Sequence, residues 1–320
     1  MLLPVVLLAG CGGDETGESR DGSRGTSFEA AVAGARSVEA DGFPRSRGRT
    51  LDQLAKRLPA VEAALATSAF TPGENRLGFG VIDKAGSFVY GKTAVYLARS
   101  PKSPAVGPFP APADPLVVEP PFRSRGAVEG TDHISAIYAA NVDLPAPGRW
   151  SVLVMTKNGG KTFGAATEVR VARSSPIPAV GELAPRVATD TLASAGGDIE
   201  AIETRVPADE MHETSFDDVA GKKPVALLFA TPRLCQSRVC GPVVDIAAQL
   251  QKRYGDRVEF IHQEVYVDNE VDKGLRPPLR AFRLQTEPWL FTVDRKGRVA
   301  ARLEGSFGTE AFDRAVKAAL

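Results

Sequence analysis

The sequence predicts two folded domains of different class, an all-β sandwich followed by an α/β domain. The chain has 320 residues, which is more than a single compact domain usually contains. Between residues 61 and 172, short runs of strand-forming residues alternate with turn residues, which is the pattern of antiparallel sheets. From residue 209 onward, continuous apolar runs alternate with segments of helical spacing, which indicates a buried sheet covered by helices.

The composition of the chain argues against several classes of function. Lys plus Arg and Asp plus Glu both number 39, so no broad basic surface for nucleic acid is expected. The sequence contains no glycine-rich phosphate loop and no Ser-His-Asp order in a supporting context, and we expect no cofactor. No apolar run approaches the roughly 18 residues that a membrane-spanning helix needs.

The first eleven residues have the features of an export signal. The short apolar run MLLPVVLLAG precedes Cys11, and a polar, glycine-rich stretch follows it. No Lys or Arg precedes this run, and the sequence leaves open where the natural start lies. Leu8-Ala9-Gly10-Cys11 resembles a bacterial lipobox, which implies that residues 1–11 are a lipoprotein signal ending at a lipidated Cys11. The resemblance places the protein on the extracytoplasmic face of the cell membrane, held by its lipid.

Two segments are predicted to have no core of their own. Residues 12–60 are rich in Gly, Ser, Arg and acidic residues without a sustained apolar period, and they are predicted to be a flexible tether. Within them a short helix is expected around Leu51 to Leu58, ended by Pro59. Residues 173–208 contain several prolines and the pair Gly196-Gly197, and they are predicted to be a linker.

Six strands are expected in the sandwich, residues 61–172. They are Glu62 to Phe70, Arg76 to Ile82, Phe88 to Leu97, Ile134 to Val142, Trp150 to Thr156 and Thr162 to Val171. Eight prolines between Pro101 and Pro121 exclude a helix or a central strand there. The segment Leu144 to Trp150 resembles the strand-entry turn of immunoglobulin-like sandwiches in exported bacterial proteins. The sequence of this domain shows no metal-ligand cluster and no catalytic dyad, so we expect it to have an interaction or spacing role.

The domain at residues 209–320 is predicted to alternate strands and helices. Expected strands are Pro224 to Thr231, Val258 to Val267, Trp289 to Val293 and Arg298 to Glu304. Expected helices are Pro242 to Tyr254, a short one at Leu279 to Phe282, and Thr309 to Leu320.

This order resembles the thioredoxin fold. Phe229 to Cys235 places a cysteine just beyond a central strand, at the position of the thioredoxin active site. Thr286-Glu287-Pro288-Trp289 lies where that family has a cis-proline facing its cysteines. The resemblance covers about a third of the chain and implies that Cys235, Cys240 and Pro288 form the redox site.

The spacing of the cysteines departs from that family, since four residues separate them here instead of two. Within a continuous helix two such cysteines lie too far apart for a disulfide, which needs Cα atoms within about 7 Å. A helix that begins at Pro242 leaves both cysteines in a loop, where they can pair.

The predicted roles of the two thiols differ. Cys235 is expected to attack and Cys240 to resolve the mixed disulfide. Arg233 and Arg238 are expected to lower the thiol pKa, whereas Glu287 raises it or accepts a proton.

Two other readings of the cysteines remain open. Copper chaperones of the Sco type also carry two cysteines at this point with a distant histidine, for which His212, His262 and His133 are candidates. A single histidine is more often structural, and no metal ligand is assigned. The second alternative is a binding module with a plain structural disulfide. The acidic residues Asp209, Glu210, Glu213, Asp217 and Asp218 are expected to form a solvated face.

Together these features predict a membrane-anchored, extracytoplasmic protein that exchanges thiols and disulfides through Cys235 and Cys240. Its expected partners are exported protein thiols or disulfides, and the membrane through the lipid anchor. The sequence leaves open the direction of the redox chemistry, the substrate, the role of the sandwich and the oligomeric state.

Overall fold

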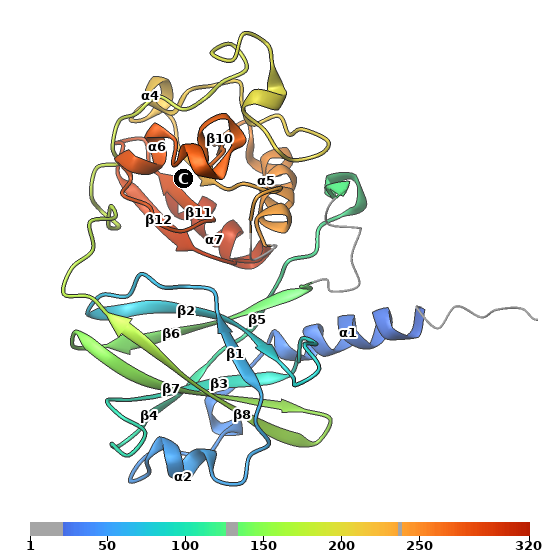
Figure 1. Cartoon of the computed structure of the whole chain (residues 1–320), viewed down its shortest axis with the longest axis vertical. Helices are drawn as coiled ribbons and strands as arrows, with labels where there is room; N and C mark the ends of the chain where they lie inside the picture. The colour runs from blue at the N-terminus through green and yellow to red at the C-terminus, as the bar shows by residue number, and fades with distance from the viewer. Residues whose placement is uncertain (1–21, 126–133, 236–238) are drawn as a thin grey trace, which may run out of the picture.

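The structure is a computed structural model that describes residues 22–125, 134–235 and 239–320. Figure 1 shows a β sandwich below a smaller α/β domain. Cys11, His133 and Arg238 lie outside the described residues. Within the described part of the chain, no helix is both long and apolar enough to cross a membrane.

The sandwich consists of two four-stranded antiparallel sheets. One has the order β1-β2-β6-β5, formed by β1 (Glu62–Leu65), β2 (Gly73–Ile82), β6 (Ala136–Leu144) and β5 (Ala113–Pro115). The other has the order β4-β3-β7-β8, formed by β4 (Val106–Pro110), β3 (Lys92–Ala98), β7 (Gly148–Asn158) and β8 (Lys161–Val171). All six expected strands are present. Within the 101–121 segment, Pro108 and Pro110 lie in β4 and Pro115 lies in β5, and both strands are at sheet edges, where a missing N–H is tolerated.

Strand β7 is covered on both faces, as its sequence predicts. Trp150, Val152 and Val154 pack into the core between the two sheets. Leu153 and Met155 point the other way, into a second cluster with Phe43, Leu51 and Leu54. Alternating side chains of one strand therefore contribute to two apolar cores.

The second cluster shows that the tether prediction for residues 12–60 is wrong for the part the structure describes. This part contains the helix α1 (Gly22–Ala35), the 3₁₀ turn η1 (Ala40–Gly42) and the helix α2 (Leu51–Ala55). Thr50 caps α2 by exchanging hydrogen bonds with Gln53. The segment's few apolar residues are too widely spaced to show a period, but they suffice to cover the outer face of β7.

The second domain is built on a four-stranded sheet with the order β10-β9-β11-β12. The strands are β9 (Val225–Phe229), β10 (Glu259–Gln263), β11 (Trp289–Val293) and β12 (Val299–Glu304). β10 runs parallel to β9, whereas β11 is antiparallel to both β9 and β12.

Helices cover both faces of this sheet. α5 (Cys240–Tyr254) and α7 (Thr309–Ala319) share one core with the sheet. α4 (Phe216–Val219) and α6 (Pro277–Ala281) belong to the core on the other face. Strand order, strand directions and helix placement are those of the thioredoxin fold.

Residues 173–208, predicted to be a linker, pack against this second domain. They contain no strand and only the 3₁₀ turn η3 (Ile199–Ala201). Ile177, Ala184 and Val187 contact the core on the α6 side, and Glu203 is buried. Proline and glycine prevent regular structure here, but they do not prevent packing.

The two domains are joined by a buried carboxylate at the start of α7. The N-cap residue of α7, Gly308, has no side chain to accept from the first-turn amides. Asp114 of β5 accepts from the backbone N–H of Gly308 at 3.0 Å, Glu310 at 2.9 Å and Ala311 at 3.0 Å. Because Asp114 belongs to the sandwich, the hydrogen bonds that cap α7 also hold the two domains together.

A second interdomain contact lies at the end of β12. Glu304 accepts from the backbone N–H of Ser68 at 3.0 Å and of Ala69 at 2.8 Å. Beside it, a Cβ on Gly305 would lie 1.6 Å from the carbonyl oxygen of Ala66, and Gly305 has a φ of +67°. Only glycine permits this backbone approach and this conformation.

We predict that Asp114→Ala destabilises the protein by about 1–2 kcal/mol, because the three buried amides of α7 lose their acceptor. Urea unfolding should show a lower midpoint. Asp143→Ala, which removes an exposed carboxylate from the neighbouring strand β6, should change the free energy of unfolding by no more than about 0.5 kcal/mol. Equal midpoints for the two variants would contradict the capping role.

Candidate functional site

Cys235 and Cys240 form a disulfide at the carboxyl end of the central strand β9. After β9 the chain turns at Thr231, whose carbonyl oxygen accepts from the N–H of Cys235 at 3.1 Å. The two Cα atoms are 6.0 Å apart, within the range of a normal disulfide. Cys235 is 9% exposed and Cys240 is fully buried, so Cys235 is the more accessible sulfur.

The start of α5 differs from the prediction by two residues. The helix begins at Cys240 rather than at Pro242, so Cys240 occupies the first turn. Pro242 is the third helical residue, and proline is tolerated there because the first four N–H groups of a helix have no partner within the helix. The pair still closes, because Cys235 lies before the helix.

The expected cis-proline is present beside this strand end. The Glu287–Pro288 peptide bond is cis and immediately precedes β11. Trp289 pairs with Phe229 across the antiparallel strands, so Pro288 lies next to the residues that lead from β9 to Cys235.

The structure describes two of the three charged residues that were predicted to tune the thiols, Arg233 and Glu287. Arg233 is exposed. The positive end of α5 lies at Cys240 itself, where it favours a thiolate. Burial raises the pKa of the half-buried Glu287 carboxyl. This carboxyl therefore takes up its charge at a higher pH than an exposed one.

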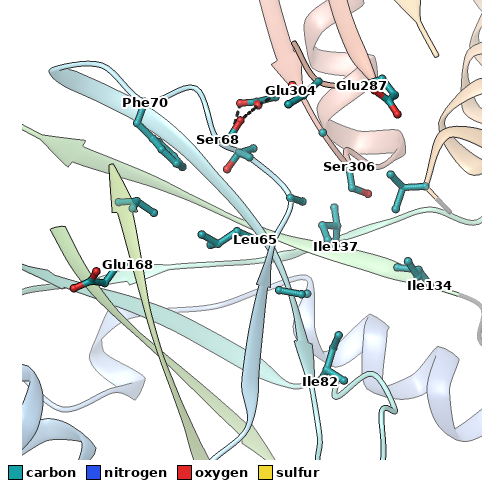
Figure 2. A pocket seen from close by; sticks show the side chains of 18 of the residues that line it. Leu65, Ser68, Phe70, Ile82, Ile134, Ile137, Glu168, Glu287, Glu304 and Ser306 are labelled. Atoms are coloured by element: carbon teal, nitrogen blue, oxygen red, sulfur yellow. Dashed lines mark hydrogen bonds between the residues drawn. The ribbon is translucent and has the colours of Figure 1, made fainter. Parts of the chain in front are cut away.

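A cavity of about 650 Å³ lies between the two domains (Figure 2). Most of its lining is apolar and comes from the sandwich, including Leu65, Ile82 and Ile137. The second domain contributes Val239, which precedes Cys240, and Glu287, which precedes the cis-proline. The chain neighbours of Cys240 and of the cis-proline therefore line the cavity, whereas neither cysteine does.

The sequence did not predict this cavity. Its lining residues come from β1, β2, β6 and β8 of the sandwich and from Val239, Glu287 and Glu304 of the second domain. They line one cavity because the two domains pack against each other.

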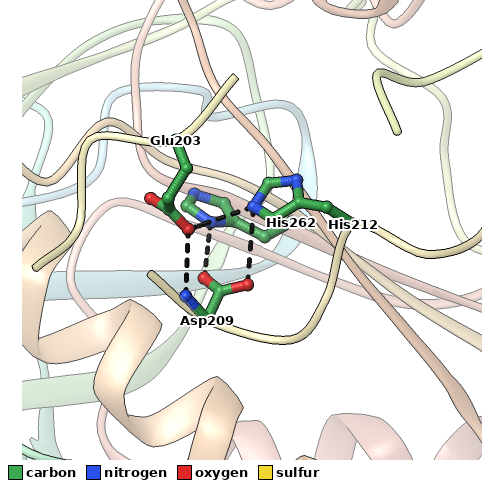
Figure 3. A group of neighbouring side chains, drawn as sticks. All are labelled: Glu203, Asp209, His212 and His262. Atoms are coloured by element: carbon green, nitrogen blue, oxygen red, sulfur yellow. Dashed lines mark hydrogen bonds and ion pairs between the residues drawn. The ribbon is translucent and has the colours of Figure 1, made fainter. Parts of the chain in front are cut away.

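A second group of polar side chains lies beneath the same strand end (Figure 3). Glu203, Asp209, His212 and His262 place one ligand atom each within 4.8 Å of one another. Such a group could hold a metal ion. The solvated-face expectation is wrong for Asp209, whose side chain is fully buried; Glu210, Glu213, Asp217 and Asp218 are exposed or half-buried.

The carboxylates and imidazoles of this group shift one another's pKa values. Burial alone would lower the pKa of His262, but Glu203 and Asp209 outweigh it and raise the pKa well above the ordinary value. Burial alone would raise the pKa of Glu203, but His262 and His212 outweigh it and lower the pKa far below the usual range. Neither histidine is isolated, because each contacts both carboxylates.

The fold and the disulfide define the second domain as thioredoxin-like. No protein-family model matches the chain, and no curated protein matches it. Two structures from Chlorobium tepidum resemble it, one described as a thiol:disulfide interchange protein DsbE and one as a thiol:disulfide interchange protein of the thioredoxin family. They cover 44% and 46% of this chain and 98% and 99% of their own, at 17% and 19% identity, with TM-scores of 0.32 and 0.30.

An endo-β-1,4-mannanase from Thermotoga petrophila also matches, at 13% identity and a TM-score of 0.20, over 39% of this chain and 22% of the enzyme. All three TM-scores are low. The assignment of the fold therefore depends on the strand order and the cysteine position described above.

We predict that Glu287→Gln lets reduced Cys235 be alkylated at lower pH, because it removes a carboxylate next to the cis-proline whose negative charge disfavours a nearby thiolate. The pH midpoint for alkylation of the reduced protein at Cys235, followed by peptide mass spectrometry, should shift down. Glu182→Gln, an exposed change near the opposite end of β12, should leave the midpoint unchanged. An upward shift for Glu287→Gln would instead identify this carboxylate as the proton acceptor of the thiol.

Proposed function

We propose that this protein is an extracytoplasmic thiol-disulfide oxidoreductase whose reactive pair is Cys235 and Cys240. The observation that carries the proposal is the position of the disulfide, at the end of the central strand and beside a cis-proline, with the neighbouring residue Val239 in the lining of an interdomain cavity. A disulfide that closes so short a loop stabilises a fold by only about 2 kcal/mol on the chain-entropy model, so stability alone explains its position poorly.

Thiol-disulfide exchange proceeds in two steps. In the reducing direction, the Cys235 thiolate attacks one sulfur of a substrate disulfide, forms a mixed disulfide and releases the other sulfur as a thiolate. The Cys240 thiolate then attacks the sulfur of Cys235 and releases the second substrate thiolate. Two electrons pass to the substrate, and the Cys235–Cys240 disulfide remains. The oxidising direction is the reverse of these steps, beginning from the disulfide and a substrate dithiol.

Each residue of the site has a distinct role in this proposal. Cys235 attacks because it is the more exposed sulfur, and Cys240 resolves because it lies buried at the positive end of α5. Pro288 lies beside the strand end, where it orients the substrate segment. Arg233 and Arg238 favour the thiolate, and Glu287 opposes it.

The substrates we propose are thiols or disulfides of exported proteins. The interdomain cavity favours substrates with an apolar segment next to the reactive sulfur. Cys11 is proposed to carry the lipid that holds the protein at the membrane. The immunoglobulin-like sandwich is proposed to support the second domain and to supply the opposite wall of the cavity.

Trapping of the mixed disulfide tests this mechanism. In the reduced protein, Cys240→Ser should accumulate a mixed disulfide at Cys235 with a disulfide-bonded protein substrate, because the resolving thiol is missing. Cys235→Ser should abolish exchange and form no adduct at Cys240, which is fully buried. Non-reducing electrophoresis and peptide mass spectrometry locate the adduct.

Thermal unfolding of both variants provides the control for folding. Undiminished exchange by a folded Cys235→Ser variant would contradict the mechanism. The absence of any adduct in a folded Cys240→Ser variant would identify the pair as a structural disulfide.

A further inference from the structure

The group of Glu203, Asp209, His212 and His262 brings together three parts of the chain. Glu203 lies in the irregular segment that follows η3, Asp209 and His212 lie further along it, and His262 is in β10 (Figure 3). All four side chains are buried, with exposures between 0% and 3%. Neither cysteine belongs to this group.

The polar atoms of the four side chains lie close to one another. His262 Nδ1 lies 2.8 Å from Asp209 Oδ2 and 3.2 Å from Glu203 Oε2. His212 Nε2 lies 3.0 Å from Glu203 Oε2 and 3.4 Å from Asp209 Oδ1. Ligand atoms about 2.1 Å from a tetrahedral ion are roughly 3.4 Å apart. An ion at the centre therefore needs the closest pair of ligand atoms to separate by roughly half an ångström, and the more distant atoms, which lie up to 4.8 Å apart, to approach one another.

The second ring nitrogen of each histidine is compatible with ligation. His262 Nε2 lies 3.1 Å from the carbonyl oxygen of Ala230, which holds a proton on Nε2 and leaves Nδ1 to bind. His212 Nδ1 has no hydrogen-bond partner among the described residues. The group that contacts Nε2 therefore decides which ring nitrogen carries the proton.

The balance of charge also favours a cation. Glu203 and Asp209 are two buried carboxylates, and the nearby cation Arg205 is engaged with Asp245 at 2.9 Å. Without an ion, only the histidine rings neutralise these carboxylates within the group. A divalent cation bound by two carboxylates and two neutral imidazoles gives a site with no net charge, which lowers the cost of burial.

We propose that Glu203, Asp209, His212 and His262 form a structural zinc site. Two imidazole nitrogens and two carboxylate oxygens in a closed, four-ligand arrangement suit Zn²⁺, whose structural sites are tetrahedral. Copper(I) prefers sulfur ligands, and this group has none. The site is separate from the redox pair and does not depend on the thiol-exchange proposal.

The zinc ion would fasten the irregular 203–212 segment to the sheet close to the cysteines. His262 contacts the carbonyl oxygen of Ala230, the residue after β9. In the same segment, Thr204 Oγ1 accepts from the N–H of Arg233, two residues before Cys235. The ion thus stabilises the turn that carries the attacking sulfur.

Zinc content and thermal stability test the proposal on the full chain with its disulfide oxidised, so that no free Cys235 or Cys240 thiol competes. After treatment with a chelator, addition of ZnCl₂ should restore about one zinc per chain and raise Tm, because the ion binds only the folded state. Glu203→Gln and Asp209→Asn preserve side-chain size and should each lower the bound zinc at least about tenfold. Glu213→Gln, an exposed change next to His212, should bind zinc like the wild type.

Three results would overturn the proposal. Wild-type protein that binds no zinc and shows no change in Tm would mean that the four residues form an ion-paired network only. Equal zinc binding by the wild type and by a folded Asp209→Asn variant would place the ion elsewhere. Retention of Mn²⁺ in preference to Zn²⁺ from an equimolar mixture would overturn the assignment of the metal.

Discussion

The geometry of the redox site depends on how the second domain is held against the sandwich. Two buried carboxylates make this contact in opposite directions. Asp114 of the sandwich accepts from the amides at the start of α7, and Glu304 of the second domain accepts from Ser68 and Ala69. Charge-assisted hydrogen bonds of this kind are strong in a low-dielectric interface, and an acceptor left without its donors is costly. The interface therefore favours one docking arrangement, and the interdomain cavity exists only in that arrangement.

The pairing of the cysteines follows from where α5 begins. Five positions of continuous helix would separate the sulfurs, but the helix starts at Cys240, and Cys235 lies in the turn after β9. Two parts of the chain lie against this turn. The cis peptide bond before β11 lies beside it, and the buried segment containing Glu203 and Thr204 packs beneath it. Cys235 is thus flanked on two sides by parts of the chain far away in sequence.

Much of the fold follows from local patterns in the sequence. Alternation and turn residues predict the strands of the sandwich, and the two apolar faces of the Trp150 run predict a strand covered on both sides. Proline chemistry excludes a central strand from the 101–121 segment, and the two strands found there lie at sheet edges. The positions of Cys235 and of the cis Pro288 follow from the resemblance to thioredoxins, because each is tied to the end or the start of a recognisable strand.

The remaining features depend on contacts between distant residues. Phe43, Leu51 and Leu54 have no periodic pattern, yet they cover β7. Asp209 lies among acidic residues that predict a solvated face, but its side chain turns inward and contacts His262, 53 positions away. Local composition carries no signal for pairing over such a separation. The same holds for the cavity, which requires both domains.

The reduction potential of the Cys235–Cys240 pair tests the central claim most directly. The full chain is equilibrated in a series of thiol–disulfide buffers, and the thiols at these two positions are counted by alkylation and peptide mass spectrometry. A redox-active pair should have a midpoint between about −120 and −270 mV, the span of known exchange catalysts. A midpoint below about −300 mV would contradict the account and identify the bond as a structural disulfide.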